Sequence, residues 1–142
     1  MCKDGGVILL VEDNMIEARL TINALKRSGV HAEVKHVADG KTAIELLTRT
    51  GRYYDCTSPL PALVLCDIQL PDVNGIDVVK QVRDKDTKTP IVMFTSSAIK
   101  EDIENSYACG ANSYITKPID LTETMRVLCA LCQYWLTLNH AT

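Results

Sequence analysis

Five positions combine residue types that could together carry out phosphoryl transfer: Glu12, Asp13, Asp67, Thr95 and Lys117. Each follows or ends a short apolar run, namely VILLV, ALVLC, IVMF and SYIT. Buried parallel strands typically read as such runs. In an open parallel α/β sheet, functional side chains gather at the carboxyl ends of the strands. We therefore expect three carboxylates, a hydroxyl and an ammonium to converge, which suits Mg²⁺-dependent phosphoryl transfer onto a carboxylate.

The charges of these residues support the same chemistry. Three crowded carboxylates repel one another and raise one another's pKa, so a bound cation would stabilise them. Oxygen ligands with water and phosphate favour Mg²⁺. Lys117 could pair with Asp67 or with a phosphoryl oxygen, and Thr95 could donate a hydrogen bond to another. Taken singly, Asp13 and Asp67 could be helix or turn caps and Lys117 a surface lysine, so the inference depends on the combination.

The elements that must position these residues alternate between strand and helix five times. This order predicts an α/β fold with a parallel sheet. Strands are expected near 7–11, 33–37, 62–66, 91–95 and 113–116. Helices are expected near 15–28, 40–49, 75–83, 99–109 and 121–138. Two helix starts have the pattern of a capping box, Asn14 with Glu17 and Asp120 with Glu123.

Length and composition limit the function classes. A chain of 142 residues fits one domain, with a core at about 7–138, and leaves no room for an attached output domain. The net charge of −3 argues against a nucleic-acid surface. No apolar run reaches ~18 residues, so no membrane span is expected. The start MCKDGG lacks the apolar region of a signal peptide, which predicts a cytoplasmic protein.

Two features leave alternatives open. Cys129 and Cys132 form a CxxC, but no second pair completes a zinc site, so reduced structural cysteines are favoured over a metal or redox role. The connection 50–61 is longer than the roughly 2–6 residues usual between a helix and a strand. It is either a packed surface loop or an element that docks a partner.

Four segments carry a family resemblance. They are LLVEDN at 9–14, LCDIQLPDVNG at 65–75, FTSSA at 94–98 and GANSYITKP at 110–118. Their order and spacing resemble the receiver domains of two-component response regulators, the family of CheY, over essentially the whole chain. The resemblance implies a doubly wound, five-stranded parallel sheet of order 2-1-3-4-5 with five helices, as in CheY.

The resemblance also implies roles for single residues. Asp67 resembles the phosphorylated aspartate of the family. Glu12 and Asp13 resemble its acidic metal-binding pair, and the backbone carbonyl of Gln69 would be a further Mg²⁺ ligand. Lys117 resembles the family's lysine, with the Lys117–Pro118 bond expected to be cis.

Thr95 and Tyr114 resemble the pair of switch residues that respond to phosphorylation. The implied function is a signalling switch that accepts a phosphoryl group from a sensor histidine kinase. Such a protein is not an enzyme beyond its own phosphorylation and autodephosphorylation. The run SYACGANSYITKPIDL and the ending CQYWL further resemble the small stand-alone regulators paired with phytochromes.

Two other functions compete with this interpretation. A haloacid-dehalogenase-like phosphatase typically has a second Asp two residues after its nucleophile, where this chain has Gln69. A receiver-like binding module that is never phosphorylated would be favoured by a missing acidic residue or lysine, but the full set is present.

The final helix predicts a homodimer. Leu121, Met125, Leu128, Cys132 and Trp135 form one apolar stripe, and Val127, Leu131, Tyr134 and Leu138 form a second about 120° away. One stripe suffices to cover a sheet. We expect the longer stripe to face inward and the second to contact a partner across the face formed by the fourth helix, fifth strand and fifth helix, unless neighbouring helices bury both.

Overall fold

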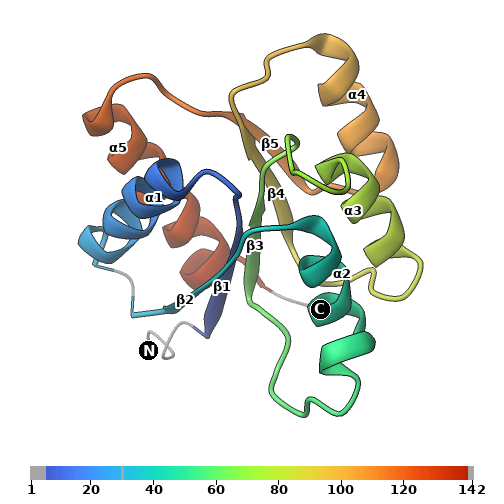
Figure 1. The fold of residues 1–142 in the computed structure, drawn as a ribbon. Coiled ribbons are helices and arrows are strands. Elements are labelled where there is room, and N and C mark those ends of the chain that lie inside the picture. Colours follow the sequence, from blue (N-terminus) through green and yellow to red (C-terminus); the bar gives the residue numbers. More distant parts are fainter. Residues whose placement is uncertain (1–5, 30, 141–142) are drawn as a thin grey trace.

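The computed structural model describes residues 6–29 and 31–140, which form a parallel sheet with helices on both faces (Figure 1). The strands are β1 (Val7–Val11), β2 (Glu33–Val37), β3 (Leu63–Cys66), β4 (Ile91–Thr95) and β5 (Ser113–Thr116). The helices are α1 (Met15–Arg27), α2 (Gly40–Thr48), α3 (Gly75–Arg83), α4 (Lys100–Cys109) and α5 (Leu121–Cys132). The strand order is β2-β1-β3-β4-β5, which confirms the expected topology.

The sheet is buried on both faces. α1 and α5 pack together on one face, and α2, α3 and α4 cover the other (Figure 1). Successive side chains of β1 alternate between the two layers: Leu9 and Val11 join the core under α2 and α3, whereas Ile8 and Leu10 join the core under α1 and α5. Burial on both faces explains why the central strands are apolar throughout.

Backbone hydrogen bonds align the carboxyl ends of the strands along one edge. The Glu12 N–H donates to the Val37 carbonyl at 3.1 Å, and the Asp67 N–H donates to the Val11 carbonyl at 3.0 Å. The Lys117 N–H donates to the Thr95 carbonyl at 2.7 Å. These bonds continue the sheet ladder by one residue and bring the candidate residues to neighbouring strand ends.

The last helix differs from the expected single helix over 121–138. It ends as an α-helix at Cys132 and continues as a π-helical segment, η2 (Gln133–Leu138). Leu128 and Cys132 of the longer stripe are buried, as expected for an inward stripe, but Leu121 at its start is 50% exposed. Leu131 of the second stripe is only 6% exposed, so neighbouring elements bury part of this stripe as well. A helix that packs against both the sheet and α1 buries more than one stripe.

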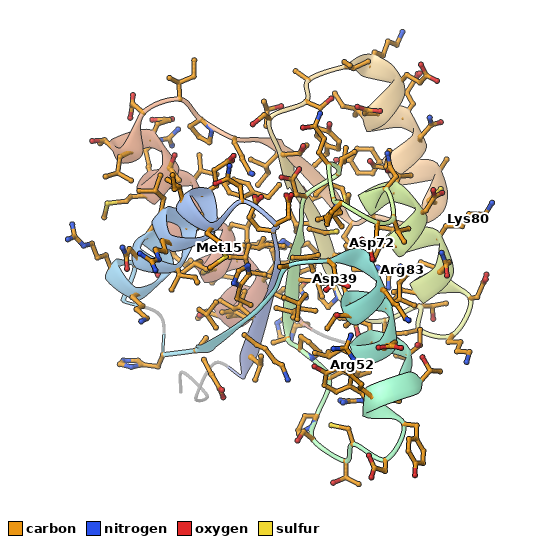
Figure 2. All side chains as sticks on the ribbon, in the orientation of Figure 1. Met15, Asp39, Arg52, Asp72, Lys80 and Arg83 are labelled. Atoms are coloured by element: carbon orange, nitrogen blue, oxygen red, sulfur yellow. The ribbon has the colours of Figure 1, made fainter. Side chains whose placement is uncertain are left out.

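The loop between β3 and α3 is tied to the start of α2. Asp72 accepts hydrogen bonds from the Gly40 and Lys41 N–H groups, both at 2.9 Å. Asp39 caps the same helix by accepting from the Thr42 N–H at 3.3 Å, and Figure 2 labels both carboxylates beside that helix start. Burial opposes ionisation, but these backbone donors hold the pKa of Asp72 below its usual value. The loop that follows Asp67 is therefore anchored.

Arg83 connects the C-terminal end of α3 to the C-terminal end of α4. Its guanidinium donates to the Gly110 carbonyl at 2.9 Å, to the Asp86 carbonyl at 3.0 Å and to Asn112 Oδ1 at 2.9 Å. Figure 2 shows it projecting from α3. Gly110 ends α4 with a φ of 113°, a left-handed conformation that favours glycine. The contact ties the end of α4 to α3 and to the start of β5.

The long connection 50–61 contains a short 3₁₀ helix, η1 (Gly51–Tyr53), and packs against β2. The Lys35 ammonium lies 5.0 Å from the centre of the Tyr53 ring. The Arg49 guanidinium donates to Cys56 Sγ at 2.8 Å and to the Ser58 carbonyl at 2.5 Å. These contacts favour the packed surface loop, while its use as a docking element stays a prediction.

Two smaller expectations concern cysteines and membranes. The five cysteines in the described part of the chain are all free, and Cys66 and Cys132 are buried in the core as small hydrophobes; Cys2 lies outside it. Over residues 6–29 and 31–140, no helix has both the length and the apolar character needed to cross a membrane.

Candidate functional site

Three of the predicted residues meet at the carboxyl edge of the sheet. The Lys117 ammonium lies 2.5 Å from Glu12 Oε1 and 3.1 Å from Asp67 Oδ2. A carboxylate that the sequence pattern had assigned to a helix cap, Glu17, lies 2.7 Å from the same ammonium. One lysine is thus shared by three carboxylates drawn from the ends of β1 and β3 and from the first turn of α1.

Burial sets the electrostatics of this cluster. Glu12 is 2% exposed and Asp67 is 8% exposed. Burial raises the pKa of the Glu12 carboxyl above its usual value, although hydrogen bonds from Lys117 and Asn14 oppose the shift. Burial acts to lower the pKa of Lys117, but its bonds to Glu12 and Glu17 outweigh that effect and hold it above the usual value. Lys117 therefore stays charged, and burial dominates at Glu12.

The two oxygens of Asp67 have different surroundings. Oδ1 accepts hydrogen bonds from the Ile68 N–H at 2.7 Å and from the Gln69 N–H at 3.3 Å. Oδ2 contacts the Lys117 ammonium. A side chain at position 75 would place its Cβ in collision with the Asp67 carbonyl oxygen, so only glycine lets α3 begin this close to the site. Backbone N–H groups therefore hold one oxygen of the carboxylate, and the Lys117 ammonium contacts the other.

The predicted metal ligands are only partly assembled. Asp13 and Gln69 are exposed at the rim, whereas Glu12 and Asp67 are buried. No three His, Cys, Asp or Glu side chains among the described residues form a preformed metal site. Glu12 and Asp67 meet at the Lys117 ammonium and Asp13 is exposed, so the convergence of all three carboxylates on one ion stays a prediction. The donor chemistry still fits a hard divalent ion, since all the candidate ligand atoms are oxygens at one sheet edge.

Thr95 and Tyr114 are linked through one residue of the loop after β4. Thr95 is 1% exposed, and its Oγ1 accepts from the Ser97 N–H at 3.4 Å. The Tyr114 hydroxyl donates to the Ser97 carbonyl at 2.7 Å, and Ser97 Oγ donates to Asp102 of α4 at 2.6 Å. Burial raises the pKa of the Tyr114 hydroxyl, which keeps it a donor. Ser97 thus connects the strand-end hydroxyl to β5 and α4.

The expected cis bond before Pro118 is not present. All peptide bonds in the described residues are trans. The trans form is the lower-energy one even before proline, by about 0.5–1 kcal/mol. Beside this segment lies a cavity of about 750 Å³, lined on one side by Glu17 and Leu20 of α1 and on the other by Lys117, Ile119 and neighbouring residues of the segment before α5.

The sequence analysis did not predict the roles of three residues at the site. Glu17 was expected to complete a capping box by bonding back to Asn14. Instead Asn14 Oδ1 accepts from the Glu17 N–H at 3.0 Å, the Asn14 N–H donates to Glu12, and the Glu17 carboxylate is left for Lys117. His36 Nε2 lies 2.7 Å from the Glu12 carbonyl oxygen. Only the third contribution, the glycine at 75, had a signal, in the run DVNG.

Comparison with known proteins gives consistent matches. The model of the response regulator receiver domain matches residues 8–128. Response regulator Rcp1 from Synechocystis sp. is 33% identical over 132 residues, covering 92% of this chain and 88% of Rcp1. Its Mn²⁺-bound crystal structure superposes with a TM-score of 0.83 at 32% identity and covers 96% of this chain and 98% of that one.

Two further crystal structures are similar. The phosphorylated cyanobacterial phytochrome response regulator RcpA has a TM-score of 0.86 at 33% identity, with 95% of this chain and 96% of that chain covered. The receiver domain of sensor histidine kinase PA1611 from Pseudomonas aeruginosa PAO1 has a magnesium ion coordinated in its active site cleft. It has a TM-score of 0.68 at 31% identity, covering 92% of this chain and 96% of that one.

Proposed function

Because this chain belongs to the response regulator receiver domain family, we propose that it is a signalling switch activated by phosphorylation of Asp67. Members of the family are signalling switches rather than metabolic enzymes, and they receive phosphate from sensor histidine kinases. The observation that carries the proposal is the buried Asp67 carboxylate, held by two backbone N–H groups and facing the Lys117 ammonium.

The geometry supports a direct transfer. Asp67 Oδ2 is the freer oxygen, so it forms the new O–P bond. The P–N bond of a phosphohistidine breaks, and the imidazole nitrogen keeps the electron pair. Lys117 then moves from the carboxylates to the phosphoryl oxygens, and the Thr95 hydroxyl donates to another oxygen. Electrostatic stabilisation of this kind dominates phosphoryl-transfer catalysis. Attack of water on the phosphorus later returns Asp67 and inorganic phosphate.

Glu12, Asp13, Asp67 and the Gln69 carbonyl would hold Mg²⁺ at this edge. When bound, the ion supplies positive charge for the transferring phosphoryl group. Support comes from the all-oxygen donor set and from relatives crystallised with Mn²⁺ or Mg²⁺. Lys117 contacts Glu12 and Asp67 in the same cluster, so the ion would lie beside the ammonium.

The simplest test of the function is incorporation of one phosphoryl group. The protein is incubated with phosphoramidate or acetyl phosphate in the presence and absence of Mg²⁺, and its intact mass is measured. A gain of a single phosphoryl group that requires Mg²⁺ is expected. A protein whose mass is unchanged under conditions that phosphorylate a known receiver would contradict the proposal.

Replacement of Asp13 by asparagine should weaken Mg²⁺ binding by about tenfold or more while leaving the fold intact. Asp13 is exposed, so the fold does not depend on its charge. Calorimetric titration with Mg²⁺ measures the affinity, and thermal unfolding checks the fold. Asp77→Asn, an exposed aspartate of α3, is the control. Equal Mg²⁺ affinities in the parent and Asp13→Asn would remove Asp13 from the ligand set.

Signal output is proposed to pass from Thr95 through Ser97 to Tyr114 and α4. The Ser97 N–H, carbonyl and hydroxyl contact Thr95, Tyr114 and Asp102 respectively. If the Thr95 hydroxyl turns toward the phosphoryl group, it loses its contact with Ser97. The loop and the two elements that hold it can then adopt a second arrangement, as expected for a two-state switch.

Thr95→Ala should still be phosphorylated, more slowly than the parent because one donor to the phosphoryl group is lost, but it should lose the response at Tyr114, since the hydroxyl is the link between them. The Tyr114 ring resonances are followed by NMR before and after phosphorylation. Thr116→Ala, an exposed strand-end threonine of β5, serves as the control. The same Tyr114 response in Thr95→Ala and in the parent would disprove the link.

The cavity between α1 and the segment before α5 is the proposed kinase contact. Leu20, Ile119 and Leu121 line it and are exposed by 46%, 105% and 50%. Exposed apolar side chains beside Lys117 fit the apolar face of a helix from the donor protein. Similarity to Rcp1 and RcpA makes a phytochrome-like kinase the proposed input.

A homodimer through the α4, β5 and α5 face is proposed on the basis of exposed apolar groups on α5 and η2. The Cys129 thiol contacts the Ser28 carbonyl at 3.9 Å, which places this flank of α5 against α1. Val127 lies about 160° around the helix, away from α1. Tyr134 and Leu138 follow it and are 50% and 60% exposed. A partner that covers Val127, Tyr134 and Leu138 would remove this apolar surface from water.

Tyr134→Glu and Leu138→Glu should shift a dimer to monomer, because each places a charge in the apolar contact, and both should leave Asp67 phosphorylation unchanged. Sedimentation velocity gives the oligomeric state. Leu20→Glu, which alters an exposed leucine of α1, is the matched control for association. Leu131 is unsuitable for this test because it lies in the core. A parent protein that is monomeric with and without a phosphoryl mimic would exclude the dimer.

A further inference from the structure

Glu17 binds the lysine of the site more closely than the phosphate acceptor does. The Lys117 ammonium is 2.7 Å from Glu17 Oε1 but 3.1 Å from Asp67 Oδ2. The Glu17 side chain is 41% exposed, whereas that of Asp67 is 10% exposed. The lysine is thus held by the buried Glu12, at 2.5 Å, and by Glu17, a carboxylate that incoming molecules can reach.

The position of Glu17 follows from the way α1 begins. Asn14 caps the helix and fixes the backbone of the first turn, which directs the third helical residue toward the end of β5. Glu17 and Lys117 also line the same cavity, together with Phe94 and Ser96 at the end of β4. A phosphodonor in this cavity meets the Glu17 carboxylate and the Lys117 ammonium, which lies 3.1 Å from Asp67 Oδ2.

We propose that Glu17 is a positioning residue that retains the Lys117 ammonium in the resting protein and so restricts phosphorylation by small anionic donors. The inference rests on the proposed phosphorylation of Asp67. A donor phosphate brings negative charge, and Lys117 stabilises it only after leaving Glu17. The Glu17 carboxylate also repels the donor directly. Both effects act on donor binding more than on the bond-breaking step.

The chain contains a matched control for this idea. Glu123 is the third residue of α5, as Glu17 is of α1, and its N–H is capped in the same way, by Asp120. Its carboxylate pairs with Arg126 rather than with Lys117. The two glutamates therefore have the same helix position and the same interaction with the helix dipole, and they differ in the cation that they bind.

The test compares the parent with Glu17→Gln, Glu17→Asp and Glu123→Gln. Initial rates of phosphorylation by phosphoramidate are measured with saturating Mg²⁺ over a range of donor concentrations. Glu17→Gln should lower the apparent KM for the donor by about three- to fivefold, the size expected for loss of a partly exposed charge, with the maximal rate within about twofold of the parent. Glu17→Asp keeps the charge but shortens the reach to Lys117, so its KM should lie between those of the parent and Glu17→Gln, whereas Glu123→Gln should stay near the parent.

A measurement without turnover separates this role from a structural one. Binding of fluoroberyllate, a phosphoryl mimic, is followed by NMR, and Glu17→Gln should bind it about three- to fivefold more tightly. If the parent is phosphorylated but Glu17→Gln has the same KM and the same mimic affinity as Glu123→Gln, the inference is overturned and the proposed function stands. If instead the parent and all variants fail to gain a phosphoryl group on Asp67, the proposed function itself is refuted, and the inference with it.

Discussion

Asp67→Asn is expected to abolish phosphorylation completely. The amide has nearly the same shape, and its oxygen can still accept the backbone N–H groups of Ile68 and Gln69, so the fold should persist. What is lost is the negative oxygen that faces Lys117. A neutral amide is a far weaker nucleophile than a carboxylate, and no other aspartate replaces it. Intact mass after incubation with phosphoramidate and Mg²⁺ should stay at the unmodified value.

The matched control is Asp77→Asn, which changes an exposed aspartate in the first turn of α3. It should gain one phosphoryl group at the parental rate. Peptide mapping of the parent locates the modified residue. Labelling of Asp67→Asn to the same extent as the parent would show that the acceptor is elsewhere, and the assignment of the site would have to be abandoned.

Lys117→Met should reduce the free energy of unfolding by about 3 kcal/mol at pH 7.5 without Mg²⁺, the size expected when one partner of a buried ion pair is removed. Lys117 is 11% exposed and Glu12 is 3% exposed in their side chains, so water replaces the lost cation poorly. Glu12 would then be a buried carboxylate beside Asp67 with no cation. Denaturation with guanidinium chloride measures the loss.

The loss should shrink at pH 5.5. Burial already raises the pKa of Glu12 in the parent, and removing Lys117 raises it further. A group whose pKa is higher in the folded state stabilises the fold at low pH, and this stabilisation is lost as the pH rises through the folded-state value. Lys80→Met replaces an exposed lysine of α3 (Figure 2) and should change stability little at either pH. An equal loss for Lys117→Met at both pH values would contradict the role assigned to Glu12.

The boundaries of the five strands could be predicted from the sequence to within one residue. Four of the five strands match the expected ranges, and the third begins at Leu63 rather than at 62. Runs such as VILLV carry this information because a strand buried on both faces has no room for polar residues. The convergence of Glu12, Asp67 and Lys117 was predictable for a related reason, since each directly follows such a run in a parallel sheet.

The features that the sequence did not predict depend on which of several possible partners a side chain contacts in the folded protein. Glu17 fits a capping box by pattern, yet a buried ammonium is a stronger partner than a backbone N–H. Asp13 shares a sequence motif with Glu12, but only Glu12 is buried, and Asp13 is exposed. The burial of Leu131 depends on how closely α5 sits against α1 and the sheet, which helical periodicity does not specify.

The two open edges of the sheet differ in their tendency to aggregate. β2 carries the exposed charges of Glu33 and Lys35, and charges along an edge strand oppose the addition of another strand. β5, with the sequence SYIT, carries none. Partial unfolding in concentrated solution would therefore recruit further chains at β5 before β2. An assembly that covers the β5 side would protect the protein from precipitation as well as transmit a signal.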